Sequence, residues 1–426
     1  MGKSRGVLCH LTSLPITNLE SAKKFVTLLS KNNIGFWQML PITPPDSHGS
    51  PYASPSAFAG WSELMKKSET AFHDEDSFWL DDWALYCTIK SHHQNLPWTQ
   101  WPIELRDRDP SALQQWRNKI EFNSELQAQS NFQAAWNDFR NFASEKEVSL
   151  IGDLPIFVAH DSADVWAHRE LFHLDEDGLP SSVAGVPPDY FSEDGQKWGT
   201  VLYDWDAHRR ENWQWWKNRF ARMLRLFDVV RIDHFRGFHS AWAIPPQDDN
   251  AKNGSWQAGP KDDLIQVLIK IANSEKQIIA EDLGIIPKEV AEMRIRNNLN
   301  GMAVLHFGFD GKLKTNPHHP KNITKQQIVY TGTHDNDTTL GWWNHSDDKR
   351  KGRIEQSLKP GEDIVSGCIR LALDCESNLA IIPLQDILRL DSDSRMNTPG
   401  TSINNWNWKF SWDNLLSEQL EWFGSL

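Results

Sequence analysis

The sequence of 426 residues contains few cysteines and none of the patterns in which cysteine usually has a structural task. The four cysteines form no Cys-x-x-Cys pair and show no zinc-finger spacing, and they are Cys9, Cys87, Cys368 and Cys375. A chain of this length can bury a sizeable core without disulfides. We therefore expect four free thiols and a reducing compartment.

The sequence also lacks the motifs that would assign a nucleotide or a membrane. No Gly-x-Gly-x-x-Gly and no phosphate-binding loop is present. No stretch has the length and hydrophobicity of a membrane span, and the apolar run that follows residues 1–6 is too short for a signal peptide. Positive charge is not in excess either, because 57 Asp and Glu residues against 44 Lys and Arg give a formal net charge of −13. These absences argue against nucleic acid and membranes as partners and predict a soluble, cytoplasmic protein with a neutral or cationic ligand.

Tryptophan, by contrast, is abundant, with 22 residues. Some of these rings must belong to the core. Flat amphipathic rings in such number also suit a surface that stacks on sugar rings, and composition leaves both uses open.

Short apolar runs alternate with helical patterns along the chain. Apolar residues spaced three and four apart predict helices, for example over 206–227, where Trp213, Trp216 and Phe220 would share one face with Leu224. Eight apolar runs predict strands, and they lie at 7–11, 36–40, 149–158, within 229–237, 277–282, 302–307, 327–333 and 379–385. This alternation is the pattern of an α/β protein, a (β/α)8 TIM barrel. We expect one catalytic barrel domain over 1–426 with insertions around the carboxyl end of the barrel, a mostly helical one over 60–147 and a long substrate loop over 159–205.

Polar side chains stand at the carboxyl ends of several predicted strands, which is where TIM barrels carry their active sites. They are Asp153, Arg231, Asp233, Glu281, His334 and Asp335. Each acid alone has a structural alternative: Asp233 could simply pair with Arg231, Glu281 could cap the next helix, and Asp335 could belong to an Asx-rich turn or a metal loop. Three acids at the ends of different strands of one barrel predict a catalytic cleft instead.

The residue types match the chemistry of retaining glycoside cleavage. One carboxylate beside an arginine would trap the cation-like sugar carbon. A second acid with a raised pKa would protonate the leaving oxygen, and a third would bind hydroxyls of the distorted sugar. A metal site is the alternative, but Arg231 beside Asp233 would compete with a cation, and the pair His318 and His319 has no obvious third ligand. We therefore expect neither a metal nor a cofactor.

Several longer motifs extend along most of the chain. They are Ser50–Gly60, Gly152–Phe157, Val183–Ser192 with Gly195–Trp198, Arg231–Gly237, Ala280–Gly284, Tyr330–Asp337 and Arg395–Thr401. With these motifs the sequence resembles the amylomaltases, the 4-α-glucanotransferases of glycoside hydrolase family 77, which are related to the α-amylases. The resemblance implies an enzyme that transfers α-1,4-glucan segments between malto-oligosaccharides by a double displacement through a covalent glycosyl-aspartate intermediate.

The resemblance also implies roles for particular residues. Asp233 corresponds to the nucleophile, Glu281 to the acid/base and Asp335 to the stabiliser that holds sugar hydroxyls. The expected substrate-binding residues are Tyr52, Asp153, Tyr190, Phe191, Gln196, Trp198, Arg231, His334, Asp310 and Asn397.

The substrate loop carries a distinctive apolar segment. Residues 183–188 are apolar and stiffened by two prolines, and Tyr190 and Phe191 follow. We expect this segment to stack on an acceptor sugar and to keep water away from the intermediate. A loop that only packs on the barrel is the alternative.

The chain departs from the family pattern at four places. The residues 16–18 replace a Gly-rich turn, the region between Gly60 and Phe78 is short, His160 stands where an acid is usual, and residues 200–201 replace an Asn-Pro pair. These departures concern acceptor preference and product size rather than the three acids. Two other functions share part of the pattern. An α-1,4-glucan hydrolase would use the same acids with water as the acceptor, and a carbohydrate-binding protein on an inactive barrel would not need all three.

Overall fold

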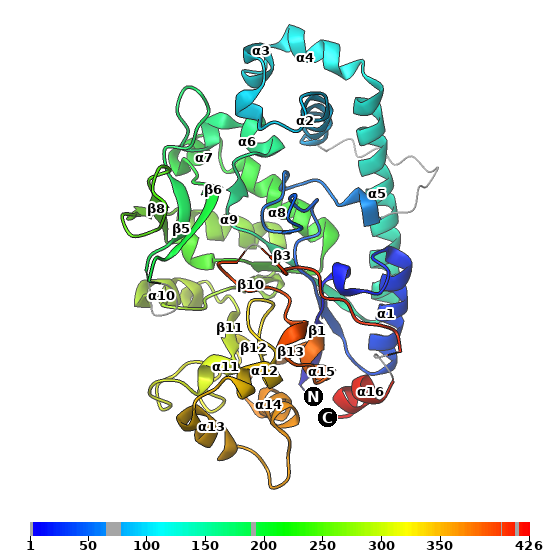
Figure 1. Ribbon diagram of the computed structural model, residues 1–426, viewed down its shortest axis with the longest axis vertical. Coiled ribbons are helices and arrows are strands. Elements are labelled where there is room, and N and C mark those ends of the chain that lie inside the picture. Colours follow the sequence, from blue (N-terminus) through cyan, green and yellow to red (C-terminus); the bar gives the residue numbers. More distant parts are fainter. Residues whose placement is uncertain (1–2, 65–77, 189–192, 402, 414–416) are drawn as a thin grey trace.

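Eight parallel strands form a barrel at the centre of the protein (Figure 1). The computed structural model describes residues 3–64, 78–188, 193–401, 403–413 and 417–426. The strands lie in the order β10 (Ile278–Ala280), β7 (Val229–Ile232), β3 (Ser149–Leu154), β2 (Phe36–Gln38), β1 (Ser4–Leu8), β13 (Leu379–Pro383), β12 (Gln327–Tyr330) and β11 (Gly301–Val304). All seven neighbouring pairs are parallel. The predicted (β/α)8 fold is confirmed.

The barrel closes between β10 and β11 through few main-chain contacts. Ile279 and Asn300 form an isolated parallel bridge, and the Ala280 N–H donates to the Asn300 carbonyl at 2.8 Å. Asp282 adds a side-chain link, because one of its carboxylate oxygens accepts from the Met302 N–H at 2.8 Å. The closing contact is therefore made partly by a side chain.

Several strands end earlier than the apolar runs predict. The run 149–158 forms a strand only as far as Leu154, and the run 302–307 ends as a strand at Val304 and continues as α11 (Leu305–Gly308). Leu305 has 0% exposure and Ile156 has 2%. Hydrophobicity thus extends beyond the paired backbone because loops at the carboxyl end of the barrel are also buried.

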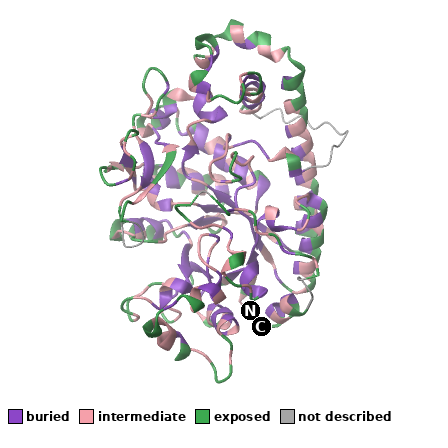
Figure 2. Ribbon diagram, in the orientation of Figure 1, coloured by how far each residue is buried: buried purple, intermediate pink, exposed green. Residues whose placement is uncertain are grey.

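Helices surround the barrel and cover its strands (Figures 1 and 2). They are α1 (Leu19–Lys31), α5 (Ile120–Glu145), α8 (Gln214–Leu226), α9 (Asp262–Ala272), α10 (Lys288–Arg296), α12 (Thr339–Asn344), α13 (Asp348–Glu355), α14 (Ile364–Asp374), α15 (Leu384–Ile387) and α16 (Ser417–Ser425). The Asn18 side chain caps α1, accepting from the Ser21 N–H at 2.8 Å. Buried positions lie on the strands and the inner helix faces, and exposed positions lie outside (Figure 2).

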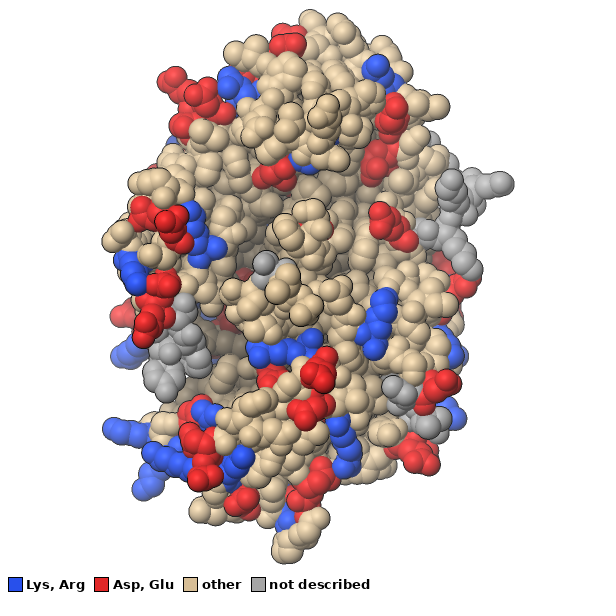
Figure 3. Space-filling model, in the orientation of Figure 1, with Lys and Arg blue, Asp and Glu red and all other residues tan. Residues whose placement is uncertain are grey.

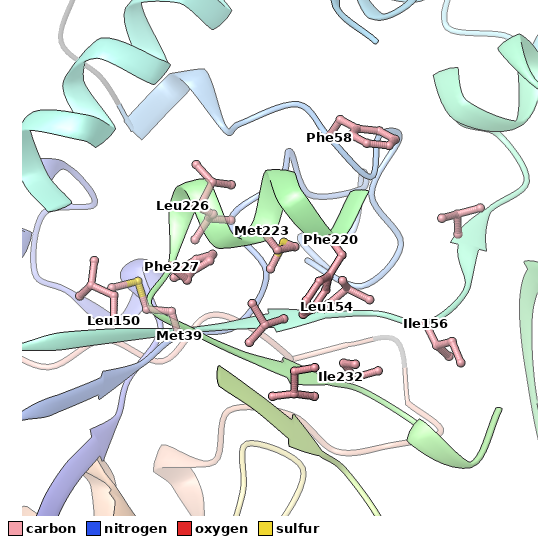
Figure 4. Packing of buried hydrophobic residues seen from close by; sticks show 14 of the residues in the cluster. Met39, Phe58, Leu150, Leu154, Ile156, Phe220, Met223, Leu226, Phe227 and Ile232 are labelled. Atoms are coloured by element: carbon pink, nitrogen blue, oxygen red, sulfur yellow. The ribbon is translucent and has the colours of Figure 1, made fainter. Parts of the chain in front are cut away.

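The contact between α8 and the barrel shows how this core is packed. Figure 4 shows Phe220, Met223 and Phe227 pointing from α8 and its end toward Leu154 and its neighbours on the strands. A Cβ atom at position 152 would lie 2.1 Å from the Phe227 ring, so only glycine allows this close approach. Burying one phenylalanine side chain contributes about 1.5–3 kcal/mol. The packing fixes β3, which contains Asp153, and β7, which ends just before Asp233.

The prediction of one continuous helix over 206–227 is wrong, because the segment forms two helices. It is divided into α7 (Trp205–Arg210) and α8, with Trp213 between them in the left-handed conformation at φ 60°. The Trp213 N–H donates to the His208 carbonyl at 2.8 Å, which closes the end of α7. Trp216 and Phe220 are buried on α8 as predicted, whereas Trp213 does not share that helix face.

A second, antiparallel sheet lies beside the carboxyl ends of β3 and β7. Its strands are β4 (Val158–Ala159), β6 (Gln196–Val201), β5 (Val183–Val186), β8 (Ser240–Ile244) and β9 (Ser255–Ala258), in that order. Part of the segment 159–205, which the sequence predicts as a long loop, therefore forms strands, together with α6 (Ala163–Ala167). The sequence shows no alternation of apolar and polar residues here, because β5 is a four-residue apolar run with a glycine and β6 is mostly polar.

A group of helices stands beyond this end of the barrel (Figure 1). It comprises α2 (Leu80–His92), α3 (Ile103–Arg106) and α4 (Pro110–Arg117), and α5 joins it to the barrel. His160 lies against it, with its ring 5.4 Å from that of Trp98 and its Nε2 2.7 Å from the Gly178 carbonyl. No helix of the described residues is long and apolar enough to cross a membrane.

Candidate active site

A chain of charged side chains crosses the carboxyl ends of β3 and β7. Asp153 and Arg231 stand opposite each other in the paired strands. Nη1 of Arg231 donates to both carboxylate oxygens of Asp153, at 2.7 and 2.6 Å, and Nη2 lies 2.9 Å from Oδ1 of Asp233. The strand register thus holds one guanidinium between two carboxylates.

Asp153, Arg231 and Asp233 depend on one another for their charged states because the cluster is buried. Burial lowers the pKa of Arg231, but the carboxylates of Asp153 and Asp233 more than offset it and leave that pKa well above its ordinary value. Burial also raises the pKa of Asp153, and the positive charge of Arg231 opposes that shift. Removing one partner from a buried ion pair is costly because it leaves the other charge uncompensated.

Glu281 lies beside Asp233 because β10 pairs with β7 in parallel. The Glu281 N–H donates to the Ile232 carbonyl at 3.1 Å. Its side chain accepts from two backbone N–H groups, with Oε2 2.7 Å from the His234 nitrogen and Oε1 2.9 Å from the Leu283 nitrogen. The carboxyl group is therefore held in one orientation next to the residue that follows Asp233.

The environment of Glu281 favours the protonated acid. Burial raises its pKa to about 7, and the negative charge of Asp233 acts in the same direction. The Arg231 charge and the two backbone N–H groups oppose this shift without cancelling it. Glu281 can therefore hold a proton near neutral pH and release it, as a general acid/base requires.

Asp335 lies in the turn that follows β12. Its Oδ1 accepts from Nδ2 of Asn397 at 2.6 Å, and Nε2 of His334 lies 3.4 Å from the same oxygen. The side chain is 46% exposed, which makes the carboxylate accessible from solvent. The turn itself is closed by Asn336, whose side chain accepts from the Thr333 N–H at 2.8 Å.

Tyr52 links the two sides of the site. Its hydroxyl donates to Oδ2 of Asp153 at 2.7 Å and lies 3.0 Å from Nε2 of His334. The rings of Tyr52 and His334 are stacked with centroids 5.3 Å apart, and the Trp406 ring lies 5.7 Å from that of Tyr52. Tyr52 therefore connects Asp153 with the neighbour of Asp335.

The second sheet contributes two more of the predicted residues. The Trp198 ring on β6 meets the His234 ring edge to face at 4.8 Å, and its Nε1 donates to Oε1 of Gln196 at 3.1 Å. Trp198 is 37% exposed. The structure thus places an accessible indole next to the residue that follows Asp233.

The remaining predicted residues are placed differently. Asp310 is not brought into this cluster, since within the described ranges its carboxylate pairs with Arg350 at 2.8 Å. Asn397 does join the cluster, through its bond to Asp335. Tyr190 and Phe191 lie outside the described residues.

Sequence reasoning missed one neighbour of the site. Arg395 donates from Nη2 to the backbone carbonyl of Asp335 at 2.6 Å and from Nε to the carbonyl of Asn397 at 2.7 Å. Arg395 is the first residue of the motif Arg395–Thr401, and this position was the one feature of the sequence that could have pointed to it. A contact between positions sixty apart leaves no periodic trace in the sequence.

On the face shown in Figure 3, most Lys, Arg, Asp and Glu side chains lie toward the margin, and the middle is largely uncharged. In the part of the chain that the structure describes, no three His, Cys, Asp or Glu side chains are grouped so that they could hold a metal ion. A (β/α)8 barrel with three acids of this arrangement at its carboxyl end defines an enzyme that acts on glycosidic bonds.

Comparison with known proteins gives the family. The model of glycoside hydrolase family 77, described as 4-alpha-glucanotransferase, matches residues 9–68 and 62–414. The chain is 37% identical to the 4-alpha-glucanotransferase of Thermus thermophilus, over 95% of this chain and 94% of that protein. It is 38% identical to that of Synechocystis sp., over 96% and 94%. The chain therefore belongs to glycoside hydrolase family 77 and is a retaining enzyme of the 4-α-glucanotransferase type.

A solved structure supports the same assignment. The amylomaltase from Streptococcus agalactiae in complex with acarbose superposes with a TM-score of 0.93 at 30% identity, covering 99% of this chain and 98% of that one. The expected family and fold are thus confirmed by independent comparisons of sequence and structure.

Proposed function

We propose that this enzyme transfers α-1,4-glucan segments between malto-oligosaccharides through a covalent glycosyl intermediate on Asp233. The observation that carries the proposal is the pairing of two acids with different surroundings on adjacent strands. Asp233 has the Arg231 guanidinium at 2.9 Å, whereas the pKa of Glu281 is raised to about 7 by burial. Two carboxyl groups in such unlike environments divide the roles of nucleophile and acid.

In the first step, the Asp233 carboxylate attacks the anomeric carbon of the donor. Glu281 gives its proton to the glycosidic oxygen, the bond between that oxygen and the anomeric carbon breaks, and the leaving chain departs as an alcohol. Asp233 becomes an ester and Glu281 becomes a carboxylate.

In the second step, Glu281 takes the proton from the 4-hydroxyl of an acceptor sugar. The acceptor oxygen attacks the anomeric carbon, the ester bond breaks, and the Asp233 carboxylate is regenerated. Asp335 binds sugar hydroxyls of the distorted donor in both steps, and Asp153 keeps Arg231 in place.

The spacing of the strands supports a retaining displacement. Neighbouring strands lie about 4.8 Å apart, and Ile232 stands opposite Ala280, one residue before each acid. Retaining enzymes have carboxyl groups about 5–5.5 Å apart, whereas inverting ones need about 6.5–9.5 Å. Acids on directly paired strands suit the shorter separation.

The rings around the acids support a sugar ligand. Trp198 and Tyr52 offer aromatic surface close to Asp233 and Asp153. The Streptococcus agalactiae relative was crystallised with acarbose, and we propose that acarbose and malto-oligosaccharides bind here too. We also propose that Gln196, Trp198 and the rest of the segment 159–205 handle the acceptor.

Incubation with maltotriose tests the proposal. Transfer yields glucose together with oligosaccharides longer than maltotriose, and chromatography separates these from the substrate. Products no longer than maltose would instead identify an α-1,4-glucan hydrolase. The Asp233→Asn variant serves as the inactive control.

A further inference from the structure

The chain after β13 crosses over the turn that carries Asp335. In Figure 1 the red trace beyond α15 passes across the barrel before it reaches α16. Four contacts join this segment to the turn. Arg395 donates to the Asp335 carbonyl at 2.6 Å, and Asn397 Nδ2 donates to Asp335 Oδ1 at 2.6 Å. The Asn397 N–H donates to the His334 carbonyl at 3.1 Å. The Ser392 hydroxyl donates to Asp337 Oδ2 at 2.8 Å.

We propose that Arg395 is a positioning residue for the transfer reaction. It sets the orientation of the Asp335 carboxylate through Asn397. Its guanidinium does not bond to the carboxylate. It bridges the backbone carbonyls of Asp335 and Asn397, at 2.6 and 2.7 Å, and so holds together the two residues whose side chains meet. The inference rests on the role proposed above for Asp335.

Arginine is suited to this task by its geometry. Nε and Nη2 point from the same edge of a rigid planar group, so one side chain can fix the distance between two carbonyl oxygens. Lysine has a single ammonium on a flexible chain and cannot fix two acceptors with the same precision.

The exposure of Asp335 explains why such a link is needed. Its side chain is 46% exposed and cannot be held by close packing on all sides. The bond from Asn397 fixes Oδ1, which leaves Oδ2 as the oxygen free to bind a sugar hydroxyl. A small displacement of a catalytic group can reduce the rate about 100-fold.

The other contacts make the proposal testable without unfolding the segment. The bonds from Ser392 to Asp337 and from the Asn397 N–H to His334 do not involve Arg395. We therefore expect the Arg395→Met variant to fold. Arg389→Met is the matched control, since Arg389 bonds to Asp363 and Ser366 away from the acids.

A double-mutant cycle separates positioning from general support. Wild type, Arg395→Met, Asp335→Asn and the double variant are compared by acarbose affinity, measured by isothermal titration calorimetry, which needs no turnover. Arg395→Met should weaken acarbose binding and lower kcat for maltotriose, the latter about 10- to 100-fold. In the Asp335→Asn background the same change should reduce the affinity for acarbose by less than about 2-fold.

Two further variants serve as controls. Arg395→Lys should have an affinity and a kcat between those of wild type and Arg395→Met, and Arg389→Met should match wild type in both.

The possible results have distinct meanings. Equal losses of affinity from Arg395→Met in both backgrounds would overturn the inference, because Arg395 would then not act through the Asp335 carboxylate. Full activity in Arg395→Met would overturn it as well. Full activity and affinity in Asp335→Asn would instead show that the role proposed for Asp335 is wrong, and the inference would fall with it.

Discussion

Asp153 and Arg231 face each other across β3 and β7, and one guanidinium nitrogen bonds to both oxygens of the aspartate. Asp153→Asn removes half of the charge that compensates Arg231, whose side chain is only 4% exposed. We expect a loss of about 3–5 kcal/mol in the free energy of unfolding and a fall in kcat/KM. Urea denaturation and maltotriose kinetics measure the two effects.

The matched control for that change is Asp310→Asn. Asp310 also pairs with an arginine, Arg350, but the aspartate is 46% exposed, and exposed pairs contribute about 0–1 kcal/mol. Similar losses of stability in Asp153→Asn and Asp310→Asn would contradict the importance of the buried trio.

The covalent intermediate should be trapped on Asp233. In Glu281→Gln the second step stalls, because no carboxylate can take the proton from the acceptor. An α-maltosyl fluoride donor needs no protonation of its leaving group, so the first step should still proceed. Mass spectrometry of the digested protein should show a maltosyl adduct on the peptide that contains Asp233. The double variant Asp233→Asn/Glu281→Gln should show none, and an adduct on another residue would refute the assignment.

The pH dependence of the first step should follow Glu281. Its pKa of about 7 lies above the ordinary value, so the acid form predominates below pH 7 and is lost as the pH rises. We expect kcat/KM for maltotriose to fall about tenfold per pH unit above pH 7. With α-maltosyl fluoride, which needs no acid, this fall should disappear. An identical fall with both donors would assign the titration to another group.

The segment before β6 should control the competition between sugar and water. Tyr190→Ala or Phe191→Ala is expected to raise glucose release relative to transfer from maltotriose, because the intermediate would be less shielded from water. Trp256→Ala provides the control, as this exposed ring lies on β9, the edge strand of the second sheet. If the ratio stays the same in both variants, the segment serves only for packing.

Much of the site could be predicted because strand register decides it. Asp153, Arg231 and Glu281 follow apolar runs whose order along the chain predicts a barrel, and a barrel brings strand ends together whatever the loops do. The family motifs then supplied the roles. Asp310 came from the family resemblance alone, and in the structure its carboxylate pairs with Arg350.

What the sequence did not predict depends on local hydrogen bonds and on tertiary contacts. Trp213 fits the helical period, but the chain leaves the helix there because the His208 carbonyl is capped by the Trp213 N–H. Strand β5 has only four residues, all apolar or glycine, and β6 is mostly polar, so neither shows an alternation of apolar and polar residues. The bond of Arg395 to Asp335 joins loops from two different strands, and no local pattern records such a contact.

The side-chain link between β10 and β11 has a consequence for how the barrel opens. Between these two strands a single bridge and the Asp282 carboxylate replace a full ladder, and Asp282 is also bound by Nε of Arg294 at 2.7 Å. We expect the barrel to open most easily between β10 and β11, and Glu281 directly follows β10. Amide hydrogen exchange should therefore be faster along β11 than along β3, and Glu281, the residue we propose as the proton donor, stands beside this weakly bonded strand pair.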